Sequence, residues 1–403
     1  GAPSQPEFRA SLEMPDYRPA DRLLVKEAGR IVGHVQVLNR MCSLESIRLP
    51  VAQLDWLSVA PKLQGQGLGA RLVRMAESQM IRNGAVIGWI RTAAPEFFGQ
   101  LGWADCAEHG WSCGAPHRVL RALIEQGFPV SGRRAKLHIR PWLVWETATL
   151  ARLYRQGLEG LWGPFQRSEA YWHWLVHRQA FGQLYVAIDG PEMIDMDQRK
   201  APVVGYVVSK GERIIELVTQ QAKPDVAAML LTRICHDAIE AGRCRVLLDV
   251  PSSNGLHQVF AKAGGRCCDY ALPWEETVMA RVLQPLALMR GMRPILEARA
   301  VAAGLPARFR LGILVGSKRY RLSRSDASIS VTQRKATRHT VQLTRAGFTQ
   351  MLLGRLDWEE AIADGHAAPQ TPEAECLARL LFPAVPFWKP HLDDLKRDDE
   401  NPY

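Results

Sequence analysis

Apolar and polar residues alternate along the first hundred positions in a way that predicts several strands around one long helix. Three runs have the alternation and β-branched content of strands, at 22–25, 31–38 and 51–59. Between the first two, Glu27-Ala28-Gly29-Arg30 is typical of a hairpin turn. From 69 to 83 the apolar residues recur at helical spacing and end before Gly84. A strand at 86–91 and a short aromatic helix at 96–101 complete an α/β order.

A similar order of elements returns in the second segment, at about 136–282. Its expected strands are 137–140, 184–188, 203–210, 214–218 and 245–249, and its expected helices are 144–157, 168–178, 225–241 and 256–263. This echo indicates a degenerate tandem repeat. The loop before the long helix, Thr219-Gln220-Gln221-Ala222-Lys223-Pro224, contains no glycine.

The last segment opens with an expected helix at 283–303. Alternating strands are then expected at 307–315, 319–322, 328–332 and 339–343, and helices at 345–353, 358–364 and 372–381. A chain of 403 residues exceeds what one hydrophobic core usually serves. This length predicts more than one domain, and the order of strands and helices predicts an α/β (α+β) protein. Two tandem mixed-sheet domains, 1–135 and 136–282, would precede an α/β domain at 283–403.

The stretch Gln64-Gly65-Gln66-Gly67-Leu68-Gly69-Ala70 joins the third expected strand to the long helix. Main-chain N–H groups there would point outward at the positive end of a helix dipole, which predicts a pyrophosphate cradle. Glycine suits such a loop because a Cβ would block close approach of phosphate oxygens.

Dinucleotide-binding folds also carry glycine-rich loops, so the loop alone has more than one interpretation. Here it follows a hairpin rather than a first strand, and Gly88-Trp89-Ile90 stands where an acidic ribose ligand would be expected. Both features disfavour a dinucleotide site. A glycine-rich turn without a ligand stays open as an interpretation.

Composition bounds the class of protein. The chain is 47% hydrophobic and 23% charged, and its apolar runs are shorter than the roughly 20 residues of a membrane span. We also expect no signal peptide. The eight cysteines form no CxxC pair, which predicts reduced thiols in a cytoplasmic protein. No His or Cys lies near adjacent Cys267 and Cys268 at ligand spacing, so we predict no metal site.

The formal net charge is +10, with local basic clusters at 133–136 and 318–324. A solvated surface, a field that attracts an anionic cofactor and nucleic-acid binding all fit that charge. The sequence has no aromatic-rich RNA motif and no zinc-finger spacing. We therefore expect neither a nucleic-acid nor a membrane partner.

Two elements in the first segment carry a family resemblance. The run Val59-x-Pro61-x-x-Gln64-x-x-Gly67-x-Gly69 resembles the acetyl-CoA signature of GNAT N-acetyltransferases. Downstream, Phe97-Phe98-Gly99-Gln100-Leu101-Gly102-Trp103 resembles that family's aromatic element. The order of domains is similar to the Eis (enhanced intracellular survival) family, in which tandem GNAT domains precede a sterol-carrier-protein-like domain. More scattered similarities lie at 163–174, 382–383 and 389–393.

The resemblance implies acetyl-CoA as cofactor. Its pantetheine arm would bind the strand backbone, its pyrophosphate the loop, and its thioester the end of the next strand. The corresponding positions are Leu57, Ser58, Val59, Gln64, Gly65, Gln66, Gly67, Leu68, Gly69, Ala70, Ala93 and Ala94.

The positions that handle protons in Eis-type enzymes differ in this chain. The tyrosine that protonates the departing thiolate corresponds to Phe98, which has no hydroxyl. The terminal carboxylate that acts as base would belong to Tyr403, although alignment on Lys389-Pro390 ends the family pattern near 395–396. Asp55, beside the cofactor loop, is the first substitute base, and Glu96 is the second. A strand-edge carboxylate and a helix cap are their structural interpretations.

The first hypothesis is an N-acetyltransferase that moves acetyl from acetyl-CoA to a primary amine by direct attack in a ternary complex. An aminoglycoside-like compound, a polyamine or a lysine side chain fits the acceptor range that the resemblance implies. The alternative is a weak or inactive acyl-CoA-binding protein. The resemblance further implies a homo-oligomer, a hexamer in Eis proteins. Only 21 residues precede Arg22, so either 6–15 replaces the usual N-terminal elements or the sequence begins inside the domain.

Overall fold

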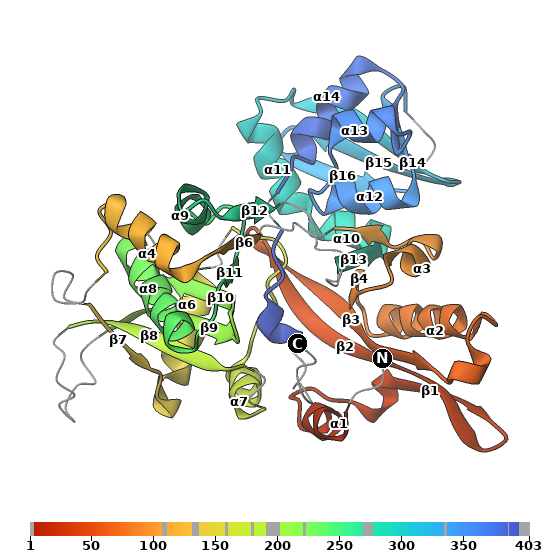
Figure 1. Cartoon of the computed structure of the whole chain (residues 1–403). Coiled ribbons are helices and arrows are strands. Elements are labelled where there is room, and N and C mark those ends of the chain that lie inside the picture. The colour runs from red at the N-terminus through yellow and green to blue at the C-terminus, as the bar shows by residue number, and fades with distance from the viewer. Residues whose placement is uncertain are drawn as a thin grey trace.

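Three β-sheets organise the chain in a computed structural model that confirms the expected mixed α/β class (Figure 1). The structure describes residues 4–106, 111–130, 137–157, 160–178, 181–190, 202–220, 223–268, 277–333, 337–385 and 387–394. Within them, no helix is both long enough and apolar enough to cross a bilayer.

The first sheet carries the glycine loop. Its strands lie in the order β1 (Arg22–Glu27), β2 (Arg30–Leu44), β3 (Ile47–Val59), β4 (Ile87–Thr92), β13 (Thr277–Val282) and β5 (Ala104–Asp105). Helix α2 (Leu68–Arg82) covers one face, where Leu72 and Val73 pack against Val35 and Leu54 from the sheet. These apolar contacts fix the direction in which α2 leaves the loop.

The second sheet is covered on both faces. Its order is β12 (Arg266–Cys268), β6 (Trp111–Gly114), β11 (Val246–Asp249), β10 (Arg213–Thr219), β9 (Val203–Lys210), β8 (Gln183–Asp189) and β7 (Leu137–Pro141). Helices α4 (Pro116–Glu125), α8 (Pro224–Glu240) and α9 (Leu256–Lys262) share one core with it. Helices α6 (Thr147–Gly157) and α7 (Glu169–His177) share the other. Because both faces are buried, its central strands are almost continuously apolar.

The first two sheets exchange strands. Strand β13 pairs antiparallel with β4 and completes the first sheet, while β6 pairs with β11 in the second. The exchange crosses the expected boundary at 135/136, because β6 precedes it and β13 follows it, so this limit does not separate the first two sheets. Local periodicity indicates that a segment is a strand, but it carries no information about a distant partner.

The third sheet has the order β16 (Ser328–Thr332), β15 (Lys318–Ser325), β14 (Arg308–Val315), β17 (Thr340–Leu343) and β18 (Ala367–Pro369). Its helices are α10 (Pro285–Gly291), α11 (Arg293–Ala302), α12 (Arg345–Leu352), α13 (Trp358–Ala363) and α14 (Pro372–Leu381). The single helix expected at 283–303 is thus two helices. Pro294 lacks the N–H that would continue the hydrogen-bond ladder, so the second helix starts beside it.

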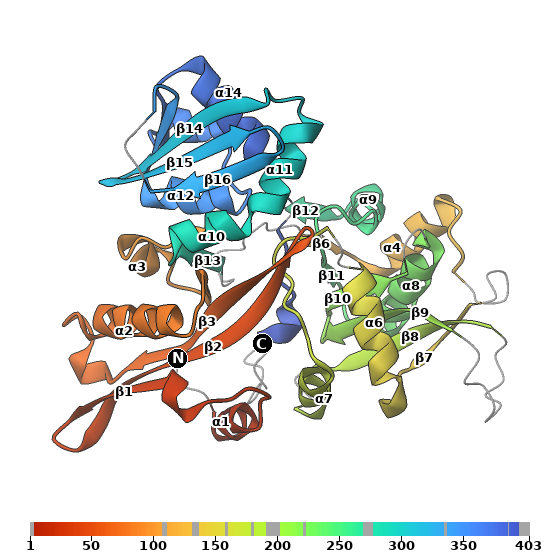
Figure 2. The ribbon, with the colours of Figure 1, turned by 180° about the vertical axis from the view of Figure 1, so that it is seen from behind.

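Residues 387–394, named here the C-terminal strap, leave the third sheet and lie between the first two (Figures 1 and 2). The Trp388 amide donates to Trp162 O at 2.8 Å, and Trp388 and Leu392 join the core around α6 and α7. Each sheet with the helices that pack on it is called a unit here, numbered as its sheet. From the opposite end of the chain, α1 (Gln5–Leu12) bridges the first and second units, because Trp174 Nε1 donates to Ala10 O at 2.7 Å. Both chain ends therefore help to hold the first two sheets together.

Candidate active site

The glycine loop forms an open cradle at the start of α2. Gly65 and Gly67 have φ of +75° and +79°, and nothing lies within 4 Å of a Cβ built on either residue. Gly67 caps the 15-residue helix without a side chain, so the first amides of α2 face open space. Gln64 and Gln66 turn back to donate to Val59 O and Lys62 O, at 3.1 and 3.3 Å. The expected cofactor loop therefore has the shape and polarity to hold a pyrophosphate.

The surroundings of the loop add positive charge and a hydrophobic wall. A cavity of about 320 Å³ beside it is lined by Gly67 and by two basic residues and one acidic residue, Lys26, Arg71 and Glu27, among others. On another side, a Cβ on Gly69 would lie 3.4 Å from Phe97 Cζ, so helix α3 (Pro95–Gln100) packs closely against the loop. Ala93 and Ala94 are exposed immediately before α3.

Strands β3 and β4 separate beyond Gln53. Their parallel ladder pairs Val51, Ala52 and Gln53 with Ile87, Gly88 and Trp89, whereas β3 continues to Val59 and β4 to Thr92. The backbone of Leu57, Ser58 and Val59 thus lies along the separated edge. An extended, amide-bearing arm can bind such an edge as an added strand does.

A bulge in β3 reshapes the strand at the same point. Its register with β2 shifts between the His34–Ser58 and Gln36–Asp55 pairs, and Trp56 there has a φ of +49°. His34 Nδ1 lies 3.2 Å from Trp56 O. Burial lowers the pKa of His34, so its imidazole is neutral at pH 7. Sequence reasoning missed His34, because nothing in local pattern marks a residue that faces a bulge.

The four expected catalytic positions lie in different surroundings. Asp55 is half-buried on β3 opposite Gln36, and its Oδ1 accepts the Trp56 amide at 2.9 Å. Glu96 is exposed in the first turn of α3. Phe98 is only 3% exposed and packs edge-on against Trp103 at 5.7 Å, within the apolar core. Tyr403 lies outside the described residues.

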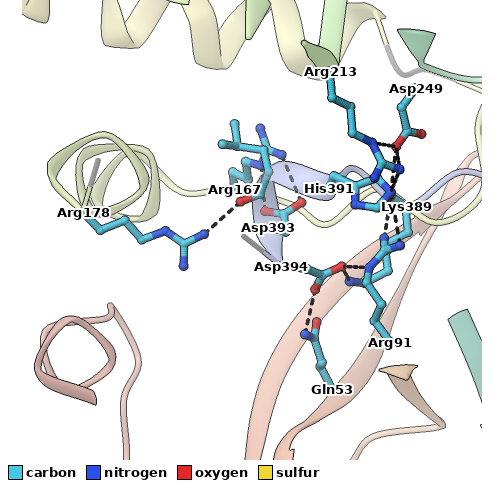
Figure 3. Close-up of polar contacts among 11 residues, drawn as sticks. Gln53, Arg91, Arg167, Arg178, Arg213, Asp249, Lys389, His391, Asp393 and Asp394 are labelled. Atoms are coloured by element: carbon cyan, nitrogen blue, oxygen red, sulfur yellow. Dashed lines mark hydrogen bonds and ion pairs between the residues drawn. The ribbon is translucent and has the colours of Figure 1, made fainter. Parts of the chain in front are cut away.

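The C-terminal strap reaches β3 and β4 at Asp394, which Figure 3 shows beside Gln53 and Arg91. Asp394 accepts hydrogen bonds from Gln53 Nε2 on β3 and Arg91 Nε on β4, both at 2.8 Å. It also pairs with Lys389. Burial opposes ionisation, but Lys389 and Arg91 hold the pKa of Asp394 well below its usual range. This carboxylate is therefore a fixed negative charge that positions the strap beside the two strands.

The other side of the strap is anchored in the second sheet. Arg167 donates to Asp393 at 2.9 and 3.0 Å (Figure 3). It also donates to Glu216 at 2.9 and 2.7 Å, and all three side chains are inaccessible to solvent. His391 Nε2 lies 2.7 Å from Asp249 Oδ2. Burial, with Arg91 nearby, lowers the pKa of His391 to about 4. The strap is thus held by ion pairs and hydrogen bonds on both sides.

Sequence reasoning singled out 389–393 but did not identify the partners of this network. Gln53 and Glu216 could have been recognised as candidate partners, because both are polar residues inside strands that are otherwise largely apolar. Within the described parts of the chain, no group of three or more His, Cys, Asp or Glu residues could hold a metal ion.

Comparison with known proteins identifies the first unit. Residues 2–106 match the family model for the acetyltransferase (GNAT) domain. No curated protein matches the sequence.

The whole chain is also similar to solved structures of low sequence identity. A GCN5-related N-acetyltransferase from Kribbella flavida is 17% identical, with a TM-score of 0.68 over 92% of this chain and 86% of that one. One from Anabaena variabilis is 15% identical, with a TM-score of 0.70 over 92% and 89%. Eis1 from Mycobacterium abscessus is 15% identical, with a TM-score of 0.65 over 95% and 94%. Residues 2–106 are therefore a GNAT acetyltransferase domain, which supports a GNAT-type acyltransferase, and the chain has the fold of solved GCN5-related N-acetyltransferases.

Proposed function

We propose that the protein transfers acetyl from acetyl-CoA to a primary amine by direct attack within a ternary complex. The observation that carries the proposal is the meeting, at one end of β3, of the open glycine cradle and the separated edges of β3 and β4. The loop from Gln64 to Ala70 would hold the pyrophosphate. The edge at Leu57–Val59 would hold the pantetheine arm and bring the thioester towards Ala93 and Ala94.

The reaction needs a free amine at the thioester carbon. The amine nitrogen attacks that carbon, the new C–N bond forms, and the C–S electron pair leaves on sulfur as the nitrogen loses its proton. Phe98 has no proton to donate, and its ring lies in the core. A CoA thiolate is a good leaving group, so alignment of the two reactants can supply much of the acceleration.

Asp55 is the proposed base. It lies on the half-buried segment of β3 that includes the bulge, close to the cofactor loop along the chain. From there its carboxylate would take the amine proton through a water molecule. His34 is the competing candidate, because its neutral imidazole contacts the same bulge through Trp56 O. Glu96 and the Tyr403 carboxylate are lesser proposals for the same role.

The finer parts of the proposal rest on family resemblance. The acceptor would be an aminoglycoside-like compound, a polyamine or a lysine side chain. The protein would work in the cytoplasm as a homo-oligomer, a hexamer by that resemblance, with its third sheet as a sterol-carrier-protein-like domain. The second candidate function, an acyl-CoA-binding protein with little turnover, is favoured by the buried Phe98, which cannot act as the acid.

The test is steady-state release of CoA from acetyl-CoA against a panel of amines. Asp55→Asn and His34→Gln are compared with wild type, and Asp326→Asn, an exposed position in the third unit, serves as the matched control. A general base contributes about 10²–10⁴-fold, so we expect Asp55→Asn to lose turnover by that factor while acetyl-CoA still binds. Loss of turnover in His34→Gln alone would instead identify His34 as the base. Binding without turnover on any amine would favour the acyl-CoA-binding protein.

A further inference from the structure

A second large recess lies between the first two units, away from the glycine loop. It is a groove of about 1040 Å³ whose walls come from the β2–β3 hairpin, from α6 and from residues 160–171. It reaches β3 at Ile47–Val51, whereas the glycine loop follows Val59 at the opposite end of that strand. At about 3.3 Å per residue, the two places are roughly 30–40 Å apart along β3.

Besides the buried Arg167, five arginines line this groove, and they come from both walls. Arg18, Arg40 and Arg48 belong to the first unit, and Arg152 and Arg155 lie three residues apart on α6. Four of the five are exposed. The half-buried Arg40 is held in place, because its guanidinium stacks 4.6 Å from the Tyr171 ring centroid and donates to Met14 Sδ at 2.8 Å.

The charge of the groove is not balanced by the described residues. Its lining carboxylates are Asp16 and Glu45, and Glu45 already pairs with Arg299. Arg167 also lines the groove, but Glu216 and Asp393 neutralise it. Within the described parts of the chain, none of the five groove arginines forms an ion pair with a carboxylate. Like charges that face each other across a groove repel, so an anion between the walls would stabilise both.

The lining also indicates what kind of anion would fit. Every basic residue in it is an arginine, whose planar fork binds phosphate or carboxylate through paired hydrogen bonds. The exposed Met41 and the half-buried Ile47 supply apolar surface beside the charges, which suits an organic body rather than a bare ion. We propose that this groove is a second binding site, for a small organic polyanion whose phosphate or carboxylate groups contact arginines on both walls.

The test uses full-length protein saturated with CoA, so that the glycine loop is occupied before any probe is added. Binding of ATP, tripolyphosphate and citrate is measured by calorimetry, which separates phosphate from carboxylate recognition. The variant Arg48→Ala/Arg152→Ala removes one exposed arginine from each wall. Arg319→Ala, an exposed arginine of the third unit, is the matched control. Unfolding of each variant without probe checks that it is folded.

We expect at least one probe to bind the wild type and the Arg319→Ala variant equally, and the double variant about tenfold or more weakly. Bound probe should also raise the melting temperature of the wild type. Equal affinity in the double variant, or no binding by any of the three probes, would overturn the proposal. Binding only of single-stranded RNA or of an acidic protein segment would overturn the small-molecule assignment. Because the site does not depend on catalysis, each result stands whether or not acetyl transfer is found.

Discussion

The first two units begin their long helices differently, although both have a strand, a loop and then a helix at that place. In the first, α2 follows Gly65 and Gly67, whose left-handed backbone leaves the amides open. In the second, Pro224 occupies the first turn of α8 and has no N–H to offer. Lys223 before it pairs with Asp189 at 2.9 Å. Of the two helix starts, the one at α2 suits a phosphate.

The two units also differ in how exposed the polar residues beside a strand bulge are. In the first, β3 bulges beside Asp55, and the face remains half-buried. In the second, β10 has a register shift beside Glu216, which is fully buried and holds Arg167. Similar sheets therefore carry an accessible polar surface in one case and an internal ion pair in the other. The comparison teaches that function depends on what fills the site and not on the fold alone.

The largest effect is expected from removing the buried cation of the second unit, Arg167. Arg167→Met leaves Glu216 and Asp393 buried without their cation, which typically costs about 3–5 kcal/mol. Urea unfolding should show this loss, whereas Arg121→Ala, in an exposed ion pair, should change little. Adding Glu216→Gln and Asp393→Asn to Arg167→Met should recover part of the stability. An unchanged unfolding free energy in Arg167→Met would contradict the view that these buried ion pairs stabilise the second unit.

A smaller effect should appear in the strap that joins both units. The pKa of His391 falls from 6.5 to about 4 in the folded state, because burial and the neighbouring Arg91 and Arg213 outweigh the attraction of Asp249. Below pH 6.5 the unfolded chain therefore binds a proton that the folded chain does not. Stability should decline as pH falls from 6.5 to 4, by up to about 3 kcal/mol.

Chemical unfolding at several pH values tests this dependence. His391→Gln should lose less stability than wild type between pH 6.5 and pH 4, because glutamine does not titrate. His34, whose pKa is lowered in the same direction, remains in both proteins and so cancels in the difference. Identical slopes in the two proteins would mean that His391 is not the group responsible.

Closing the cradle of the first unit should weaken acetyl-CoA binding. Gly67→Ala places a Cβ in the open space of the loop and strains a φ of +79° by about 1–2 kcal/mol. We expect binding about 10- to 100-fold weaker, measured by calorimetry. Gly242→Ala has similar strain and similar open space after α8, so it should reduce stability but leave acetyl-CoA binding unchanged.

The smallest effect is expected at the helix start of the second unit. Lys223→Ala removes a partly exposed ion pair, which is worth about 0–1 kcal/mol. Thermal unfolding should therefore shift only slightly, and acetyl-CoA binding should not change. A loss of acetyl-CoA binding in this variant would show that the second unit takes part in cofactor binding. That result would contradict the contrast drawn between the two helix starts.

Sequence reasoning reached further in the first unit than in the second. Strands β1 to β4 and helix α2 follow from periodicity and from the glycines, since each signal is local. The pairing of β13 with β4 could not be inferred, because nearly two hundred residues separate the partners. The Asp394 contacts with Gln53 and Arg91 were missed for the same reason. Polar residues within largely apolar strands could at least have marked where to look.

The strand exchange has a consequence for synthesis of the protein. Until residue 282 has left the ribosome, β4 cannot pair with β13, and its free edge is open to wrong partners. Thr92 and Thr277 are 185 positions apart. At about 5–20 residues per second, that edge waits roughly 10–40 s. A nascent chain of this protein therefore needs protection, by its own later segments or by a chaperone, well after the glycine loop has been made.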